Sequence, residues 1–164
     1  NLYSKGIFKE SEKFNPYNKT TRYQFSLMLY RALDLEVPAT TDFKDIAKLD
    51  AEAQSAIKAL NKLGVINGVN KETFAPYNNI TRAQTAKMVY RLLESKGYQD
   101  KANATMPFSD VTATDAELNK AAAQLNALGI MTGSNGKLNP NAPLTRDQMS
   151  KVLNNALQAL EGLK

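Results

Sequence analysis

The sequence TRAQ at residues 81–84 lies in the middle of this 164-residue chain, and its pattern T-R-x-Q recurs as TRYQ at residues 21–24 and TRDQ at residues 145–148. The three copies are about 60 residues apart, a spacing typical of tandem structural repeats. A threonine followed three residues later by glutamine forms a capping box. The threonine hydroxyl accepts from the third helical amide, and the glutamine side chain binds the amide of the threonine. Each copy therefore predicts the start of a helix.

Apolar residues continue each of these predicted helices. They occur three, six to seven and ten to eleven positions after the arginine, which is one stripe on a helix of 3.6 residues per turn. We expect the three stripes to meet in a common interior through Met28, Met88 and Val152 or their immediate neighbours. The chain should then form one assembly of repeats around a shared centre.

A second kind of helix is predicted before each of the last two capping boxes, over residues 51–63 and 115–128, which are rich in Ala, Leu, Lys and Gln. Asp50 and Thr114 are the expected N-caps. Gly64 and Gly129 follow these helices, where glycine can adopt the left-handed conformation that ends a helix. Gly97 and Gly162 are the expected stops after the last two capping-box helices. The sequence thus predicts five helices and an all-α fold.

The repeats are expected at residues 1–36, 42–97 and 107–164, each a helix, a glycine loop, a proline turn and a capping-box helix. Only residues 1–5 stand where the first helix of repeat 1 should be, although Leu2 keeps the register of Leu60 and Leu125. We therefore expect repeat 1 to be N-terminally truncated and the chain to be part of a longer protein.

Composition narrows the possible functions. The chain has no cysteine and no histidine, which excludes disulfides, thiolate nucleophiles, serine triads and the commonest zinc sites. We expect no enzyme activity, no cofactor and no metal site. No apolar run is long enough to span a bilayer, so no membrane insertion is expected. The net charge of +5 favours a polyanionic partner, but the basic residues are scattered rather than clustered as in nucleic-acid-binding arms.

Taken together, these motifs resemble the S-layer homology repeat. The residues that carry the resemblance in repeat 2 are Phe43, Asp45, residues 64–68 (GVING), 74–76 (FAP) and 80–84 (ITRAQ); in repeat 3 they are Phe108, Asp110, residues 129–133 (GIMTG) and 144–146 (LTR). The chain departs from the family in having glutamine where glutamate is usual in the capping box, and in having no tryptophan.

The resemblance implies a pseudo-threefold spindle of helix-loop-helix repeats around a central three-helix bundle. It also implies inter-repeat grooves that bind an anionic, often pyruvylated, secondary cell-wall polysaccharide linked to peptidoglycan. The implied function is non-covalent anchoring of a secreted or S-layer protein to a bacterial cell wall, which would place the chain outside the cell. A helical protein-interaction module that binds peptide in the same grooves is the alternative.

The capping-box arginines, Arg22, Arg82 and Arg146, are the first candidate ligand-binding residues. A cation at a helix N-terminus is unfavourable for the helix dipole, so three copies suggest an electrostatic task such as holding a carboxylate beside free helix-end amides. The alternative is that each arginine pairs with an aspartate such as Asp45 or Asp110 and ties neighbouring repeats together. The other candidates are two tyrosines after the prolines and two loop dipeptides, namely Tyr17, Tyr77, Asn67, Gly68, Thr132 and Gly133.

Overall fold

The computed structural model describes residues 17–38 and 40–163 of the chain. In these residues it has five helices and no strand, which confirms the predicted all-α fold. The helices are α1 (Arg22–Ala32), α2 (Ala51–Lys62), α3 (Arg82–Ser95), α4 (Ala116–Ala127) and α5 (Arg146–Glu161). None of the helices in this part of the chain is both long and apolar enough to cross a membrane. The expectations about Leu2 and the missing first helix of repeat 1 lie outside the described residues.

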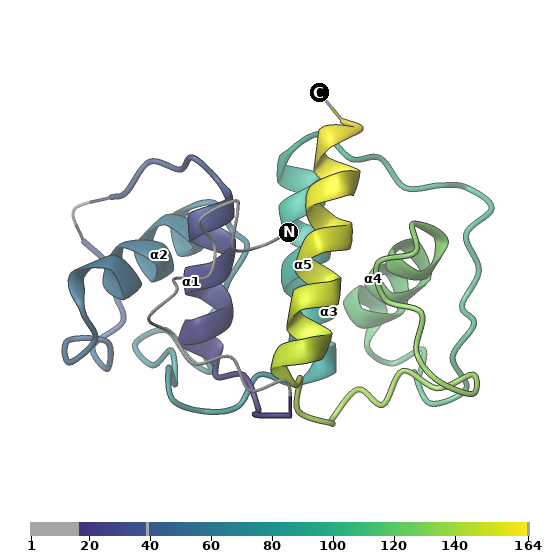
Figure 1. Ribbon diagram of the computed structural model, residues 1–164, viewed down its shortest axis with the longest axis horizontal. Coiled ribbons are helices and arrows are strands. Elements are labelled where there is room, and N and C mark those ends of the chain that lie inside the picture. Colours follow the sequence, from purple (N-terminus) through teal and green to yellow (C-terminus); the bar gives the residue numbers. More distant parts are fainter. Residues whose placement is uncertain (1–16, 39, 164) are drawn as a thin grey trace.

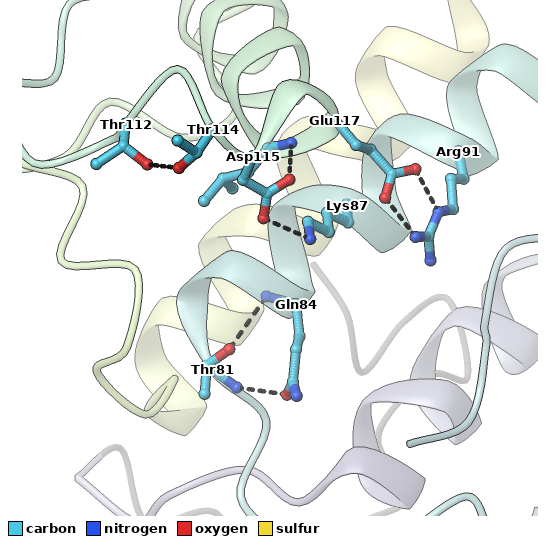
Figure 2. A network of polar contacts seen from close by, with 9 residues as sticks. Thr81, Gln84, Lys87, Arg91, Thr112, Thr114, Asp115 and Glu117 are labelled. Carbon is cyan, nitrogen blue, oxygen red and sulfur yellow. Dashed lines mark hydrogen bonds and ion pairs between the residues drawn. The ribbon is translucent and has the colours of Figure 1, made fainter. Parts of the chain in front are cut away.

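The helix starts follow the predicted capping chemistry with one exception. Capping boxes are present at Thr21, Thr81 and Thr145, and Figure 2 shows the one formed by Thr81 with Gln84. Asp50 caps α2 as expected.

The exception is α4, where the expected N-cap Thr114 is wrong by one residue. Asp115 is the cap, and its Oδ1 accepts from the Leu118 amide at 3.0 Å. The Thr114 hydroxyl instead lies 2.7 Å from that of Thr112 (Figure 2). Both residue types can cap a helix, so a sequence in which they are adjacent does not decide between them.

The helix ends also use the predicted glycines. Gly64, Gly97 and Gly129 have φ values of 82°, 95° and 74°, the left-handed region in which a residue without a Cβ is not strained. Gly162 is the C-cap of α5 but keeps a right-handed conformation, with φ of −67°. The left-handed stop is therefore confirmed after α2, α3 and α4.

Helices α1 to α4 pack in two pairs. In each pair the first helix of a repeat packs on the capping-box helix of the repeat before it: α2 on α1 and α4 on α3, with α5 in contact with both α1 and α3 (Figure 1). Met28, Met88 and Val152 are all buried in a single hydrophobic cluster, as expected. The pseudo-threefold spindle around a three-helix bundle stays a prediction.

A ring of backbone hydrogen bonds links the starts of α1, α3 and α5. It joins the three residues that precede the capping threonines, Thr20, Ile80 and Leu144. Thr20 N–H donates to Leu144 O at 2.8 Å, Leu144 N–H to Ile80 O at 3.0 Å, and Ile80 N–H to Thr20 O at 2.8 Å. All three residues are buried, so these bonds satisfy polar groups that would otherwise be costly to bury. Each repeat is thus bonded to both others at this end of the helices.

The loops before the prolines contain a strained residue in one repeat. Ala75 has φ of 59°, and Asn139, which occupies the same position in repeat 3, has φ of 57°. The left-handed region costs an ordinary residue about 1–2 kcal/mol, whereas asparagine tolerates it better. Ala75→Asn should therefore raise the free energy of unfolding by about 0.5–1 kcal/mol, measured by denaturant unfolding. Asn139→Ala should lower it by a similar amount, and unchanged midpoints in both variants would contradict the assigned backbone conformation.

Candidate functional site

Two grooves lie at equivalent places on the molecule. Groove A, of about 200 Å³, is lined by Arg22, residues 66–69, Gln84, Lys87, Met88 and Arg91. Groove B, of about 390 Å³, is lined by Arg82, residues 129–134, Asn139, Ala142, Pro143, Gln148, Lys151, Val152 and Asn155. Each groove combines the capping-box arginine of one repeat with the glycine loop and the capping-box helix of the next. The structure thus brings Arg22 together with Asn67 and Gly68, and Arg82 together with Thr132 and Gly133.

The glycine loops have their shape because a phenylalanine packs directly beneath them. A Cβ added to Gly68 would lie 2.5 Å from Phe43 Cε1, and one added to Gly133 would lie 2.4 Å from Phe108 Cε1. Both phenylalanines are buried in the core. The second glycine of each loop is therefore required by packing, and the two phenylalanines serve as the scaffold beneath the loops.

An aspartate holds the loop before each proline in place. The Asp45 carboxylate accepts from the amides of Phe74 and Ala75 at 2.9 and 2.8 Å. Asp110 accepts from Leu138 and Asn139 at the same two distances. Partial burial raises the pKa of Asp110, but these amide hydrogen bonds outweigh it and lower the pKa overall. These carboxylates are scaffold, since their oxygens are engaged with the loop backbone.

Arg22 lies almost completely inside the protein, with 6% of its surface exposed. Its Nε donates to Phe74 O at 2.9 Å, a terminal nitrogen donates to Asn67 O at 3.1 Å, and the guanidinium carbon is 4.7 Å from the centre of the Phe74 ring. Burial lowers the pKa of Arg22, and the nearby charge of Asp45 partly offsets this. Arg22 therefore ties repeat 1 to the loop of repeat 2, through carbonyl groups rather than through a direct pair with Asp45.

Arg82 is less enclosed and less fully bonded than Arg22. It is half-buried, and its Nε donates to Leu138 O at 2.6 Å. Burial lowers the pKa of Arg82, and the charge of Asp110 partly offsets this. Within the part of the chain that the structure describes, its two terminal nitrogens form no hydrogen bond. The guanidinium is thus oriented by one protein contact while its remaining donors stay available in groove B.

The expectation of free helix-end amides beside the arginines is wrong. The first amides of α1, α3 and α5 donate to carbonyls of the neighbouring repeat: Arg22 to Asn78 O, Arg82 to Ala142 O and Arg146 to Asn18 O, at 2.8–2.9 Å. The following amides of α1 and α3 donate to Pro76 O and Pro140 O. These repeat contacts use the donors that an anion at an isolated helix end would bind.

The remaining candidates lie apart from the grooves. Tyr17 and Tyr77 are 86% and 59% exposed, and neither lines groove A or B. The Tyr77 ring packs edge-on against Tyr23, with centroids 5.7 Å apart. The loop that would face Arg146 belongs to residues outside the described part of repeat 1.

The sequence reasoning missed the basic residues on the groove walls. Lys87 and Arg91 follow Gln84 by three and seven positions, and Lys151 and Asn155 follow Gln148 in the same way. This spacing puts them on the same helix face as the capping glutamine, so the pattern could have been recognised in the sequence.

Among the described residues, no group of three or more Asp and Glu side chains is arranged to hold a metal ion.

Comparison with known proteins identifies the family. The model of the S-layer homology domain matches residues 42–86 and 107–150. The chain is 32% identical, over 90% of its length, to a surface-layer 125 kDa protein of Lysinibacillus sphaericus, and 28% identical, over 93%, to S-layer protein EA1 of Bacillus anthracis. An endoglucanase of Bacillus sp. strain KSM-635 is 31% identical over 88% of the chain.

The chain spans only a small part of these relatives: 12% of the L. sphaericus protein, 18% of EA1 and 15% of the endoglucanase. The family match and the surface-layer relatives confirm the expected location, that of a secreted protein in the cell wall or S-layer. Because the family model covers more than half of the residues, and because the capping boxes, glycine loops and aspartates are arranged as one repeated unit, the chain belongs to the S-layer homology domain family.

Proposed function

We propose that this chain anchors the protein of which it is part to the bacterial cell wall by binding an acidic saccharide of a secondary cell-wall polysaccharide in groove B. The observation that carries the proposal is the position and hydrogen bonding of the Arg82 side chain. Its guanidinium lines the larger groove, is fixed through Nε, and keeps its terminal nitrogens free of protein partners among the described residues. The chain acts as a non-catalytic module.

The chemistry of groove B suits a carboxylate carried on a sugar. A planar guanidinium can donate two parallel hydrogen bonds to a carboxylate, which gives both strength and orientation. Lys151, with 73% of its side chain exposed, adds a second positive charge. Thr132, Asn139 and Gln148 add neutral groups that can bind sugar hydroxyls. A pyruvate ketal on a hexose suits both the positive and the neutral polar groups of the groove, because it places a carboxylate beside ring hydroxyls.

Similarity to enzymes supports an anchoring role for the chain. The relatives named as an endoglucanase, an exoglucanase and a xylanase match it over 15%, 9% and 8% of their own lengths. The same module therefore occurs beside different catalytic and surface-layer proteins. That distribution favours a general attachment function over one that depends on the attached protein.

Sedimentation with cell walls tests the proposal. The chain should co-sediment with purified sacculi, and should stay in solution after acid treatment has removed the secondary polymer. Arg82→Ala should co-sediment less than the wild type. Equal binding to stripped sacculi would instead favour attachment to peptidoglycan or protein, including the alternative of a peptide-binding module.

Salt should weaken this binding. In about 1 M salt the screening length falls to about 3 Å, so contacts between exposed charges and an anionic polymer lose most of their strength. We expect the affinity for the purified polysaccharide to fall at least fivefold or so between low salt and about 1 M salt. Isothermal titration calorimetry would measure it, and an affinity independent of salt would contradict a site built around Arg82 and Lys151.

A further inference from the structure

The two cations of groove A that come from α3 are both paired with carboxylates of the next repeat. Lys87 Nζ lies 2.8 Å from Asp115 Oδ2. Arg91 binds Glu117 in a bidentate way, with Nε 2.8 Å from Oε2 and a terminal nitrogen 2.5 Å from Oε1. Figure 2 shows the two pairs side by side, bridging α3 to the N-terminal end of α4. The carboxylates themselves do not belong to the groove lining.

With these pairs, the described part of groove A has no unpartnered cation. Its third positive charge, Arg22, is buried and donates to Phe74 O and Asn67 O. The hydrogen bond from Lys87 is the main cause of the lowered pKa of Asp115, so this carboxylate stays ionised at neutral pH. Every cation that the described residues contribute to groove A is therefore already matched by a protein acceptor.

Groove B differs at each equivalent position. Asn155 replaces Arg91 and is neutral. Lys151 replaces Lys87, but its partner Asp147 is on the same helix, 3.2 Å away, and both side chains are more than half exposed. Exposed ion pairs of this kind contribute little to stability, so Lys151 can leave Asp147 and bind a ligand carboxylate at a low cost in free energy. Arg82 keeps its terminal nitrogens free of partners in the described residues.

A ligand carboxylate would meet different costs in the two grooves. In groove A it would have to displace Asp115 or Glu117 and leave that carboxylate unpaired. One ion pair would then be exchanged for another, with little net gain in binding free energy. In groove B it would add hydrogen bonds to the terminal nitrogens of Arg82, which have no protein partner among the described residues. The physical expectation is a clear preference for groove B.

We infer that Asp115 and Glu117 act as built-in competitors of the ligand, which neutralise groove A and restrict binding of an acidic saccharide to groove B. The inference rests on the proposed function and adds to it the residues that choose between two otherwise equivalent grooves. Removing the two charges should convert groove A into a second site.

Nuclear magnetic resonance titration of the whole chain tests this. The probe is the methyl glycoside of a 4,6-O-pyruvylated hexose, and the backbone amides of Gly68 and Gly133 report on grooves A and B. In the wild type, Gly133 should shift well before Gly68. In Asp115→Asn/Glu117→Gln, affinity at Gly68 should increase at least fivefold or so. Asparagine can still cap α4, so the variant should fold.

A matched control removes an equivalent pair away from the grooves. Glu52 pairs with Arg31 at 2.8 Å, as Glu117 does with Arg91, but neither Glu52 nor Arg31 lines groove A or groove B. Glu52→Gln should leave the preference for groove B unchanged. Equal saturation of both glycine signals in the wild type would overturn the inference, as would an unmoved Gly68 in the folded double variant. A probe that shifts neither glycine would contradict the proposed function itself.

Discussion

Replacing Arg22 by alanine should lower the free energy of unfolding by about 3 kcal/mol or more, which corresponds to a fall in Tm of roughly 6–12 °C for a chain of this size. The buried guanidinium donates to two carbonyl oxygens and lies over the Phe74 ring. Its removal leaves Phe74 O without its donor in a buried place, and each hydrogen bond to a charged group contributes about 1.5–3 kcal/mol. Chemical denaturation and differential scanning calorimetry would measure the loss.

Arg22→Lys should be nearly as unstable, because an ammonium group cannot reach both carbonyls in the fixed geometry of the guanidinium. Arg82→Ala provides the comparison at the same position of the next repeat. It should cost only about 1–1.5 kcal/mol, since Arg82 makes one hydrogen bond and that bond is weakened by the partial exposure of the side chain to solvent. Equal destabilisation by the two alanine variants would show that the arginines do not differ in the way assigned here.

The sequence predicts the helix starts well because their causes are local. A capping box joins residues three apart, so Thr81 and Gln84 define the beginning of α3 without any information from the rest of the chain. The same holds for the glycines after α2, α3 and α4. Where two capping residues are adjacent, as at Thr114 and Asp115, local chemistry leaves the boundary uncertain by one residue.

The difference between Arg22 and Arg82 could not be predicted from their identical motifs. The difference arises from residues of the following repeat. Phe74, whose carbonyl oxygen accepts from Arg22, is 52 residues further along the chain. Phe74 offers a ring to Arg22, whereas the equivalent Leu138 offers Arg82 only its carbonyl oxygen. One aromatic residue in a distant loop thus contributes to the burial of one arginine, while its neighbour stays accessible.

The error about free amides has a similar origin. In an isolated capping-box helix, the first backbone amides have no hydrogen-bond acceptor within the helix. In the folded chain, carbonyls of the next repeat accept from them, as Asn78 O does from Arg22 and Ala142 O from Arg82. Repeats that close on one another satisfy groups that a single repeat leaves open. An anion site inferred from one repeat therefore loses its backbone donors and keeps only its side chains.

Arg82 should be the side chain on which binding depends most. Arg82→Ala should weaken the affinity for a purified acidic wall saccharide by about tenfold or more, because a charge-assisted hydrogen bond contributes roughly 1.5–3 kcal/mol. Calorimetric titration of the folded variant would measure the loss, with a thermal melt of the same sample to separate binding from unfolding.

Arg82→Lys is the more informative substitution, and it should weaken binding nearly as much as alanine although it keeps the charge. In the wild type, Nε is held by Leu138 O at 2.6 Å, which leaves the two terminal nitrogens to face a carboxylate together. A lysine has one nitrogen, which cannot serve the carbonyl and both carboxylate oxygens in that geometry. Affinity that lysine restores fully would show that groove B needs only a positive charge. Full affinity in folded Arg82→Ala would remove this residue from the site and leave Lys151 as the cation to test next.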